Sequence, residues 1–192
     1  DPGSILVYDN KTKKYDKYFY WKLKKDKNFL SSKDLVNKTE NLLKDTIKSQ
    51  LISDVEVGTF LSGGVDSSLI TVLSNKFINN KLKTFTLSSG DQNFDESIKA
   101  KQISDYIKAE NINYNFNKKD ILNTIGAIPN VYGEPFGDSS QIPTMLISKF
   151  AKNYVKVVLG GDGGDEMFGG YNRYKYLNNY FPIIKFLPQG IR

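Results

Sequence analysis

The sequence predicts an α/β fold with an open, mainly parallel sheet and helices on both of its faces. Segments of strand length alternate with segments of helical periodicity from about residue 35 to residue 160. Residues 55–61 form a short apolar run with β-branched residues, as in a buried strand, and residues 155–160 lack polar alternation, as a central parallel strand does. Each of these runs leads into a glycine-rich, acidic turn, which marks the two places where we expect function.

The individual elements follow from local patterns. Extended segments are expected at 4–8 and 18–23, on either side of a polar turn. A helix is expected from Ser31 or Ser32 to about Ile52, because apolar residues recur there at helical spacing. The remaining predicted strands are 55–61, 82–87, 112–116 and 155–160, and the remaining predicted helices are 67–77, 96–106, 119–128 and 142–153.

Composition limits the chemistry of the chain. Its 192 residues, 39% hydrophobic and 25% charged, are typical of one globular domain with small appendages. Neither Cys nor His is present, so disulfides, thiolate metal sites, cysteine nucleophiles and the commonest general base are excluded. The net charge of +6 suits nucleic acid or an anionic small substrate such as a nucleotide, and a general Lys bias also explains it.

Sequence features also bear on location. No run reaches the roughly 18 apolar residues of a membrane span, and the first residues lack the basic start and apolar core of a signal peptide. A cytoplasmic protein without a membrane partner is therefore expected.

The first turn is SGGVDSS, residues 62–68, between a predicted strand and a predicted helix. In open parallel sheets, ligands bind beyond the carboxyl ends of the strands. Gly63 and Gly64 let an anion approach the backbone amides, and the start of the following helix offers free N–H groups. Asp66 would repel phosphates, which is explained if Mg²⁺ lies between them. The lysine of a Walker loop is missing.

The second turn is contained in GGDGGDEMFGGYNRY, residues 160–174. Asp162, Asp165 and Glu166 lie within five residues and repel one another, so a cation or hydrogen-bond donors are needed there. The interpretation of this segment as a flexible acidic surface loop is disfavoured, because an apolar strand of the kind found in sheet interiors leads directly into the turn. If the two turns follow neighbouring strands, Asp66 and Asp165 can share one Mg²⁺ together with substrate oxygens.

These motifs resemble those of a known family. SGGVDSS resembles the pyrophosphate-binding loop of the ATP pyrophosphatase superfamily, whose fold is of the adenine nucleotide alpha hydrolase-like type. GGDGGDEMFGGYNRY closely resembles the signature of the synthetase domain of glutamine-hydrolysing asparagine synthetases, which β-lactam synthetases share. PGSILVYD, YFYW and EPFGDSSQIPTMLISKFAKNYVKVVL also resemble that family, so the resemblance extends over essentially the whole chain.

The resemblance implies an ATP-dependent amide ligase. Such enzymes activate the side-chain carboxylate of aspartate with MgATP as an aspartyl-adenylate and release pyrophosphate, and ammonia then displaces AMP to give asparagine. It therefore implies ATP and Mg²⁺ as cofactors, with aspartate and ammonia as the other substrates. A homodimer is compatible with it.

The resemblance also assigns residues by motif position. Asp66 and Asp165 would bind Mg²⁺. Asp162 stands where some members carry a catalytic Glu that supports the adenylate, although its side chain is shorter, and Glu166 would position the ammonia nucleophile or a basic side chain. The residues implied to bind ATP are Phe60, Ser62, Gly63, Gly64, Asp66, Ser67, Leu87, Gly160 and Gly161.

The family's domain order implies that residues 1–30 are an extended linker after a glutaminase domain. Residues 31–192 would then form the synthetase domain, truncated at its C-terminal end. The glutaminase domain of the family begins with a Cys nucleophile, which this chain lacks. A glutaminase domain is therefore expected elsewhere in the full-length protein, and this chain alone is expected to bind ATP weakly and to turn over weakly or not at all.

Two other functions stay open at this point. A related ligase could amidate a different carboxylate, in surface-sugar or peptide modification, because the two turns would handle ATP and not the acceptor acid. A tRNA-modifying enzyme is less favoured, since such enzymes often transfer sulfur through a Cys and the Lys residues here form no stripe with aromatics. No nucleic-acid partner is therefore expected.

Overall fold

The computed structural model describes residues 1–24, 30–90, 95–134 and 137–186. The chain divides into two compact units, residues 1–40 and residues 41–192. Their boundary falls inside helix α1 (Ser32–Gln50). None of the helices among the described residues combines the length and the apolar character that crossing a membrane requires.

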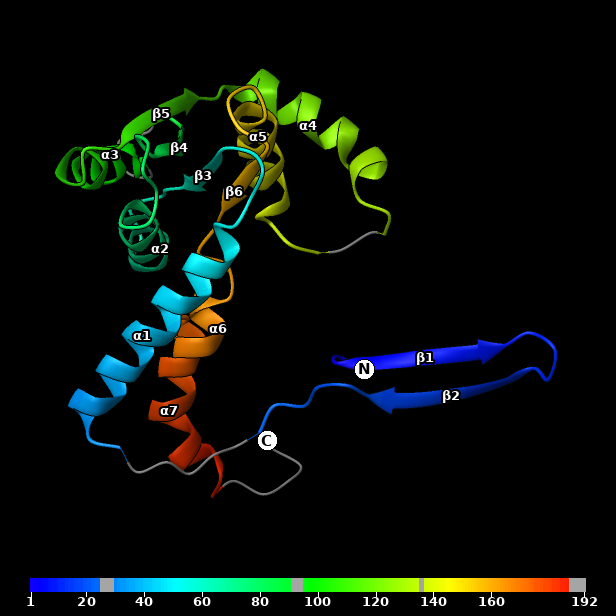
Figure 1. Ribbon diagram of the computed structural model, residues 1–192. Helices are drawn as coiled ribbons and strands as arrows, with labels where there is room; N and C mark the ends of the chain where they lie inside the picture. The colour runs from blue at the N-terminus through cyan, green and yellow to red at the C-terminus, as the bar shows by residue number, and fades with distance from the viewer. Residues whose placement is uncertain (25–29, 91–94, 135–136, 187–192) are drawn as a thin grey trace. The chain divides into compact units, whose positions relative to one another are not determined.

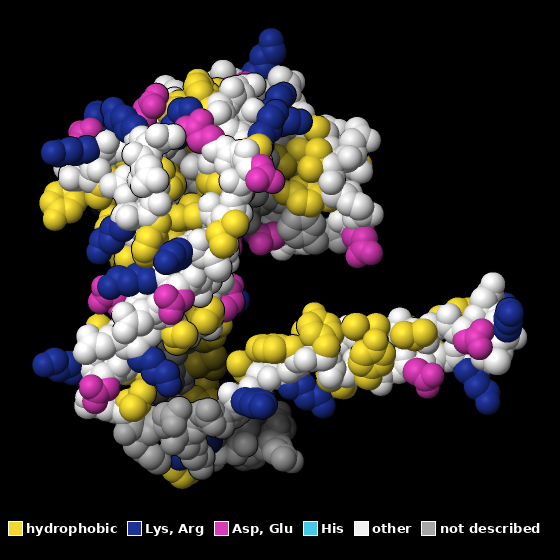
Figure 2. Space-filling view, in the orientation of Figure 1, with side chains coloured by type: hydrophobic (Ala, Val, Ile, Leu, Met, Phe, Trp, Pro, Cys, Tyr) yellow, Lys and Arg dark blue, Asp and Glu magenta, His cyan; other side chains and the backbone are white. Residues whose placement is uncertain are grey.

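The first unit begins with an antiparallel hairpin of β1 (Ser4–Asp9) and β2 (Lys14–Phe19), in which Asp9 pairs with Lys14. The Asp9 carboxylate closes the turn by accepting from the backbone N–H of Lys11 and the hydroxyl of Thr12, both at 2.8 Å. This closure starts the second strand at residue 14, so the predicted strand at 18–23 is placed four residues too late. Hydrophobic side chains stay exposed along the hairpin (Figure 2).

Helix α1 begins as its sequence predicts. The hydroxyl of Ser31 accepts a hydrogen bond from the backbone N–H of Asp34 at 3.2 Å, and it donates to the Asp34 carboxylate at 2.6 Å. This is the N-cap arrangement that serine favours. The predicted helix ending near residue 52 is confirmed to within two residues.

The second unit contains a parallel sheet of four strands, β3 (Val57–Phe60), β4 (Lys83–Ser88), β5 (Glu110–Asn115) and β6 (Val157–Leu159). Their order in the sheet is β5-β4-β3-β6. The chain runs outward from β3 to β5 and then returns to the other side of β3. The strand order therefore reverses between β3 and β6, which is where open parallel sheets bind ligands.

Helices cover both faces of this sheet (Figure 1). Helices α2 (Val65–Asn75) and α3 (Ser97–Tyr106) lie on one face, and α4 (Lys118–Val131) and α5 (Gln141–Ala151) lie on the other. The predicted fold class is confirmed, and these four helices lie within three residues of their predicted bounds.

Two helices were not predicted. Helix α6 (Gly164–Phe168) is a single turn inside the glycine-rich segment, and α7 (Asn172–Ile184) follows it. The glycines around α6 obscure any periodicity. The sequence of α7 is rich in Asn and Tyr, which have modest helix propensity.

The side chains buried on the two faces of the sheet differ in polarity. Phe85 of β4 is completely buried and packs with Ala151 and Val155. The neighbouring strand positions, Thr84 and Thr86, point to the opposite face because side chains alternate along a strand, and both are buried as well. The α5 side of the sheet is therefore an aromatic and aliphatic core, whereas the α2 side contains buried hydroxyl groups.

Candidate functional site

The two glycine-rich turns start at the same edge of the sheet, the one formed by the carboxyl ends of its parallel strands. Strands β3 and β6 are parallel neighbours, with Thr59 opposite Leu159, so the first turn (62–68) and the second turn (160–170) leave the sheet side by side. A cavity of about 980 Å³ opens at this edge.

Ten of the twelve predicted site residues line this cavity. They are Phe60, Ser62, Gly64, Asp66, Ser67, Leu87, Gly160, Gly161, Asp162 and Asp165. The structure thus brings together residues from β3, β4, α2 and the segment after β6. The two predicted residues that do not line it are Gly63 and Glu166.

The backbone conformation and the close packing at position 63 both require glycine. The φ of Gly63 is +83°, in a region that residues with a side chain rarely adopt. A Cβ atom there would lie 2.7 Å from the Cβ of Lys99 and 3.0 Å from the backbone N of Ala100. Gly63 therefore packs the first turn against the start of α3, next to the cavity.

The serines of the first turn are bonded to one another. The hydroxyls of Ser62 and Ser67 lie 2.9 Å apart, and the Ser67 hydroxyl also accepts from the backbone N–H of Ser62 at 3.3 Å. Among the described residues no side chain caps α2 at Gly64. The backbone N–H groups of the first turn of α2 thus lie at a helix start, the kind of position that binds anions.

The second turn packs directly on the first. A Cβ atom at Gly161 would lie 2.8 Å from the backbone N of Ser67, and one at Gly164 would lie 2.6 Å from the Oδ2 of Asp66. Real Cβ atoms essentially never approach other atoms this closely. Glycine at these two positions is what allows the Asp66 carboxylate to lie against the backbone next to Asp165.

The cavity is acidic. Four carboxylates line it, those of Asp66, Glu96, Asp162 and Asp165, and the described lining residues include no Lys or Arg. A bound cation would offset the repulsion between these carboxylates and an anionic ligand. No three acidic side chains within 1–24, 30–90, 95–134 and 137–186 group closely enough to hold a metal ion by themselves. Two carboxylates completed by ligand oxygens match the donor set that Mg²⁺ prefers.

Glu166 faces a different partner. Its carboxylate accepts a hydrogen bond of 2.6 Å from the hydroxyl of Tyr171. This hydrogen bond lowers the pKa of Glu166 and raises the pKa of Tyr171 to about 12. The guanidinium of Arg173 lies over the Tyr171 ring, 4.2 Å from its centre. The Glu166 side chain is thus held beside the cavity and does not line it. Its predicted catalytic role stays a prediction.

Sequence reasoning missed several residues of the cavity. Ser89 and Phe116 directly follow β4 and β5, so the rule that ligands bind beyond strand ends could have identified them. Pro143, Thr144 and Ile147 enter from helix α5, and no motif in the sequence indicates that this helix reaches the cavity.

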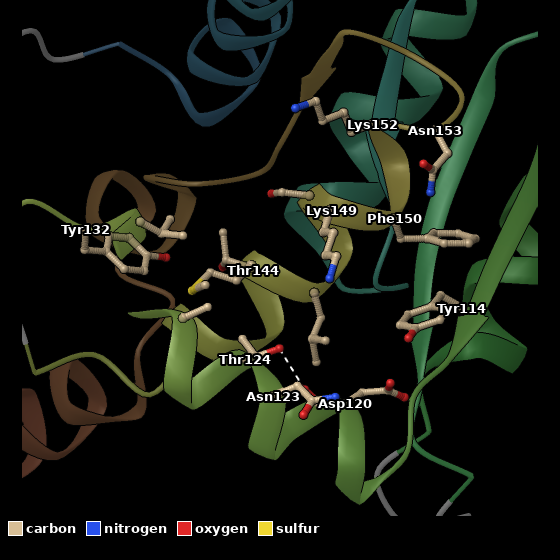
Figure 3. Close-up of a pocket in the computed structure, with 15 residues that line it drawn as sticks. Tyr114, Asp120, Asn123, Thr124, Tyr132, Thr144, Lys149, Phe150, Lys152 and Asn153 are labelled. Carbon is tan, nitrogen blue, oxygen red and sulfur yellow. Dashed lines mark hydrogen bonds between the residues drawn. The ribbon is translucent and has the colours of Figure 1, made fainter. Parts of the chain in front are cut away.

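A second cavity of about 640 Å³ lies beside α4 and α5 (Figure 3). None of the twelve predicted site residues lines it. Its wall includes Tyr114 and Phe150, whose rings stack with centres 4.8 Å apart, and burial raises the pKa of Tyr114. Thr144 lines both cavities. The predicted site residues thus lie at or beside the first cavity and not at this one.

The family model described as "Asparagine synthase" matches residues 38–190 of this chain. A protein named "Putative asparagine synthetase [glutamine-hydrolyzing] 2" from Methanocaldococcus jannaschii is 39% identical over 189 residues, which cover 97% of this chain and 36% of that one. "Asparagine synthetase [glutamine-hydrolyzing] 1" from Bacillus subtilis is 35% identical over 158 residues, which cover 82% of this chain and 25% of that one.

The chain therefore spans about a quarter to a third of the length of these relatives. Among solved structures, it is similar to an NH3-dependent NAD synthetase from Campylobacter jejuni, with a TM-score of 0.48 and 19% identity. That match covers 71% of this chain and 60% of that one.

Proposed function

Since this chain belongs to the asparagine synthase family, we propose that it is an ATP-using amide ligase domain that converts aspartate to asparagine. One observation carries the proposal. The two glycine-rich turns meet at one cavity, where the Asp66 carboxylate lies against Gly164 and Asp165 lines the same wall. This arrangement suits a phosphate chain that is held between the two turns.

The first turn would hold the pyrophosphate end of ATP. The hydroxyls of Ser62 and Ser67 and the N–H groups at the start of α2 are donors at the cavity edge. Phe60 and Leu87 offer apolar contact for the adenosine, and the backbone of Gly160 and Gly161 lies close by on the same wall.

Asp66 and Asp165 would hold Mg²⁺. When bound, this ion would screen the negative charge of ATP and of the acceptor carboxylate within the acidic cavity. The two aspartates supply the carboxylate oxygens that such an ion uses, while the nucleotide supplies the others. The chain's own task would be to keep both aspartates on the wall of one cavity, and the close approach of Asp66 to Gly161 and Gly164 supports this.

The proposed reaction has two steps. An oxygen of the aspartate side chain forms a bond to the α-phosphorus of ATP, and the bond from that phosphorus to the bridging oxygen breaks and releases pyrophosphate. Ammonia then forms a bond to the activated carbonyl carbon, AMP leaves, and the nitrogen loses a proton. A carboxylate can accept that proton without any His, and Asp162 is the predicted catalytic residue that lines the cavity.

Ammonia would come from another part of the full-length protein. The curated relatives are named as glutamine-hydrolysing, and they are much longer than this chain. The chain itself contains no Cys and so cannot supply a cysteine nucleophile for glutamine hydrolysis. We infer that a glutaminase domain is its partner.

Isotope exchange between labelled pyrophosphate and ATP tests the proposal, because adenylation of the acceptor is reversible. Label accumulates in ATP over time, so even a slow reaction can be detected. We expect exchange that requires aspartate and Mg²⁺, at a low rate for this chain alone. Glutamate and a reaction without any acid are the matched controls. Exchange that proceeds equally without aspartate, or only with a different carboxylic acid, would contradict the proposed substrate.

A further inference from the structure

A buried hydroxyl lies directly beneath the start of the first turn. The side chain of Thr86, on β4, is 1% exposed and donates a hydrogen bond of 2.8 Å to the carbonyl oxygen of Leu61. The same hydroxyl accepts a hydrogen bond of 2.9 Å from the amide Nδ2 of Asn111, on β5. Three neighbouring strands are thus connected through one hydroxyl to the residue that precedes Ser62.

Both backbone groups of Leu61 are fixed by β4. Its N–H donates to the carbonyl oxygen of Phe85 at 2.9 Å, and its carbonyl accepts from Thr86. Because a peptide unit is planar and trans, the direction of the Leu61 carbonyl also sets the direction of the Ser62 N–H. That N–H points to the Ser67 hydroxyl at 3.3 Å. The hydroxyl of Thr86 is therefore one of two contacts from β4 that hold the peptide from which the first turn leaves the sheet.

The hydrogen bonds run in one direction, from Asn111 through Thr86 to Leu61. A hydroxyl has one proton to donate, and in Thr86 it goes to Leu61 while the oxygen accepts from Asn111. Such aligned bonds strengthen one another in a buried environment, where water cannot replace a lost partner.

We propose that Thr86 and Asn111 are positioning residues for the phosphate-binding turn. They do not line the cavity and would not touch the nucleotide. They hold the Leu61–Ser62 peptide in the orientation that aims the serines and the start of α2 at the phosphates. The proposal rests on the function given above, in which this turn binds the pyrophosphate end of ATP.

Thr84 provides a matched control within the same strand. It is completely buried, and its hydroxyl also accepts from Asn111, at 3.0 Å. Its own proton points to the carbonyl of Glu110, at 3.4 Å, and not to the turn. Thr84→Val and Thr86→Val thus make the same chemical change beside the same amide, and only Thr86→Val removes a contact to the turn.

Amide hydrogen exchange of the ligand-free chain tests the positioning without any nucleotide. We expect Thr86→Val to raise the exchange rate of the Ser62 and Gly64 amides roughly tenfold more than Thr84→Val does, as loss of one buried hydrogen bond implies. Thr86→Ser keeps the hydroxyl and should restore slow exchange. Equal exchange at these two amides in both valine variants would overturn the proposal, whether or not the chain binds ATP.

Nucleotide affinity gives the functional readout. We expect Thr86→Val to weaken ATP binding roughly tenfold while adenosine binding changes by less than about twofold, and Thr84→Val to change neither. An equal loss of ATP and adenosine affinity would show a general structural effect and overturn the proposal. If a valine variant does not fold, Thr86→Ala and Thr84→Ala make the same comparison. Absence of ATP binding in the unchanged chain would instead contradict the proposed function, and the exchange experiment would still decide the positioning.

Discussion

The carboxylate of Asp66 lies directly against the backbone of Gly164. A Cβ atom at Gly164 would lie 2.6 Å from the Oδ2 of Asp66 and 3.0 Å from its Oδ1. The backbone φ of Gly164 lies outside the region reserved for glycine, so the close approach alone requires glycine here. The Asp66 carboxylate thus occupies the space that the missing side chain of Gly164 leaves at the second turn.

Gly164→Ala should displace Asp66 and weaken MgATP binding by roughly tenfold or more, because the added methyl group occupies the place of the carboxylate. Overpacking at the same contact should also lower the free energy of unfolding by about 1–3 kcal/mol. Titration calorimetry and urea unfolding measure the two effects. Unchanged ATP affinity in this variant would contradict the proposed role of the contact.

Gly126→Ala is the control for that experiment and a prediction of its own. Gly126 lies inside helix α4, and a Cβ atom there would meet no other atom within 4 Å. Alanine should therefore raise the free energy of unfolding by about 0.5–1 kcal/mol through its higher helix propensity, with no change in ATP affinity. A destabilised Gly126→Ala variant, measured by urea unfolding, would show that α4 does not lie as described.

Phe85→Ala should lower the free energy of unfolding by about 3–5 kcal/mol. The Phe85 ring is completely buried and contacts the rings of Phe150 and Tyr154, with centres 6.4 Å and 5.8 Å away. Tyr106→Ala is a suitable comparison, because that ring is 85% exposed and its loss should cost far less. Similar losses for the two variants would contradict the position of the core.

The pair of Ser88 and Asp95 should give a pH-dependent contribution to stability. The Ser88 hydroxyl donates to the Asp95 carboxylate at 2.6 Å, and this hydrogen bond is the main cause that lowers the pKa of Asp95 below its ordinary value of 3.8. A carboxyl whose pKa is lower in the folded state stabilises the fold above its unfolded pKa, and this stabilisation is lost as pH falls through the folded pKa.

Ser88→Ala should therefore be less stable than the unchanged chain at neutral pH, and the difference should shrink as the pH falls below about 4. Thermal unfolding over a pH series measures this difference. A difference that stays constant to the lowest pH at which the chain folds would exclude Asp95 as its source.

The fold and most of the cavity could be predicted because their signals are local. Buried strands such as β3 and β6 read as apolar runs, and the turns after them carry glycines and acids in recognisable order. Two parallel strands that end at one edge then bring Asp66 and Asp165 to the same cavity.

What could not be predicted depends on contacts between distant segments. The hydrogen bond from Tyr171 holds Glu166 beside the cavity, and no spacing in the sequence reveals it. Thr144 reaches the cavity only because α5 packs over β4. The start of β2 was misplaced because the Asp9 carboxylate, rather than residue propensity, decides where the hairpin turns.

Calorimetric titration with ATP, with and without Mg²⁺, tests the central claim most directly. The unchanged chain should bind ATP only when Mg²⁺ is present, and Asp66→Asn and Asp165→Asn should each weaken that binding by roughly tenfold or more. Asp54→Asn, at an exposed acid that does not line the cavity, should bind as the unchanged chain does. ATP binding that is independent of Mg²⁺ and equal in all four proteins would contradict the account.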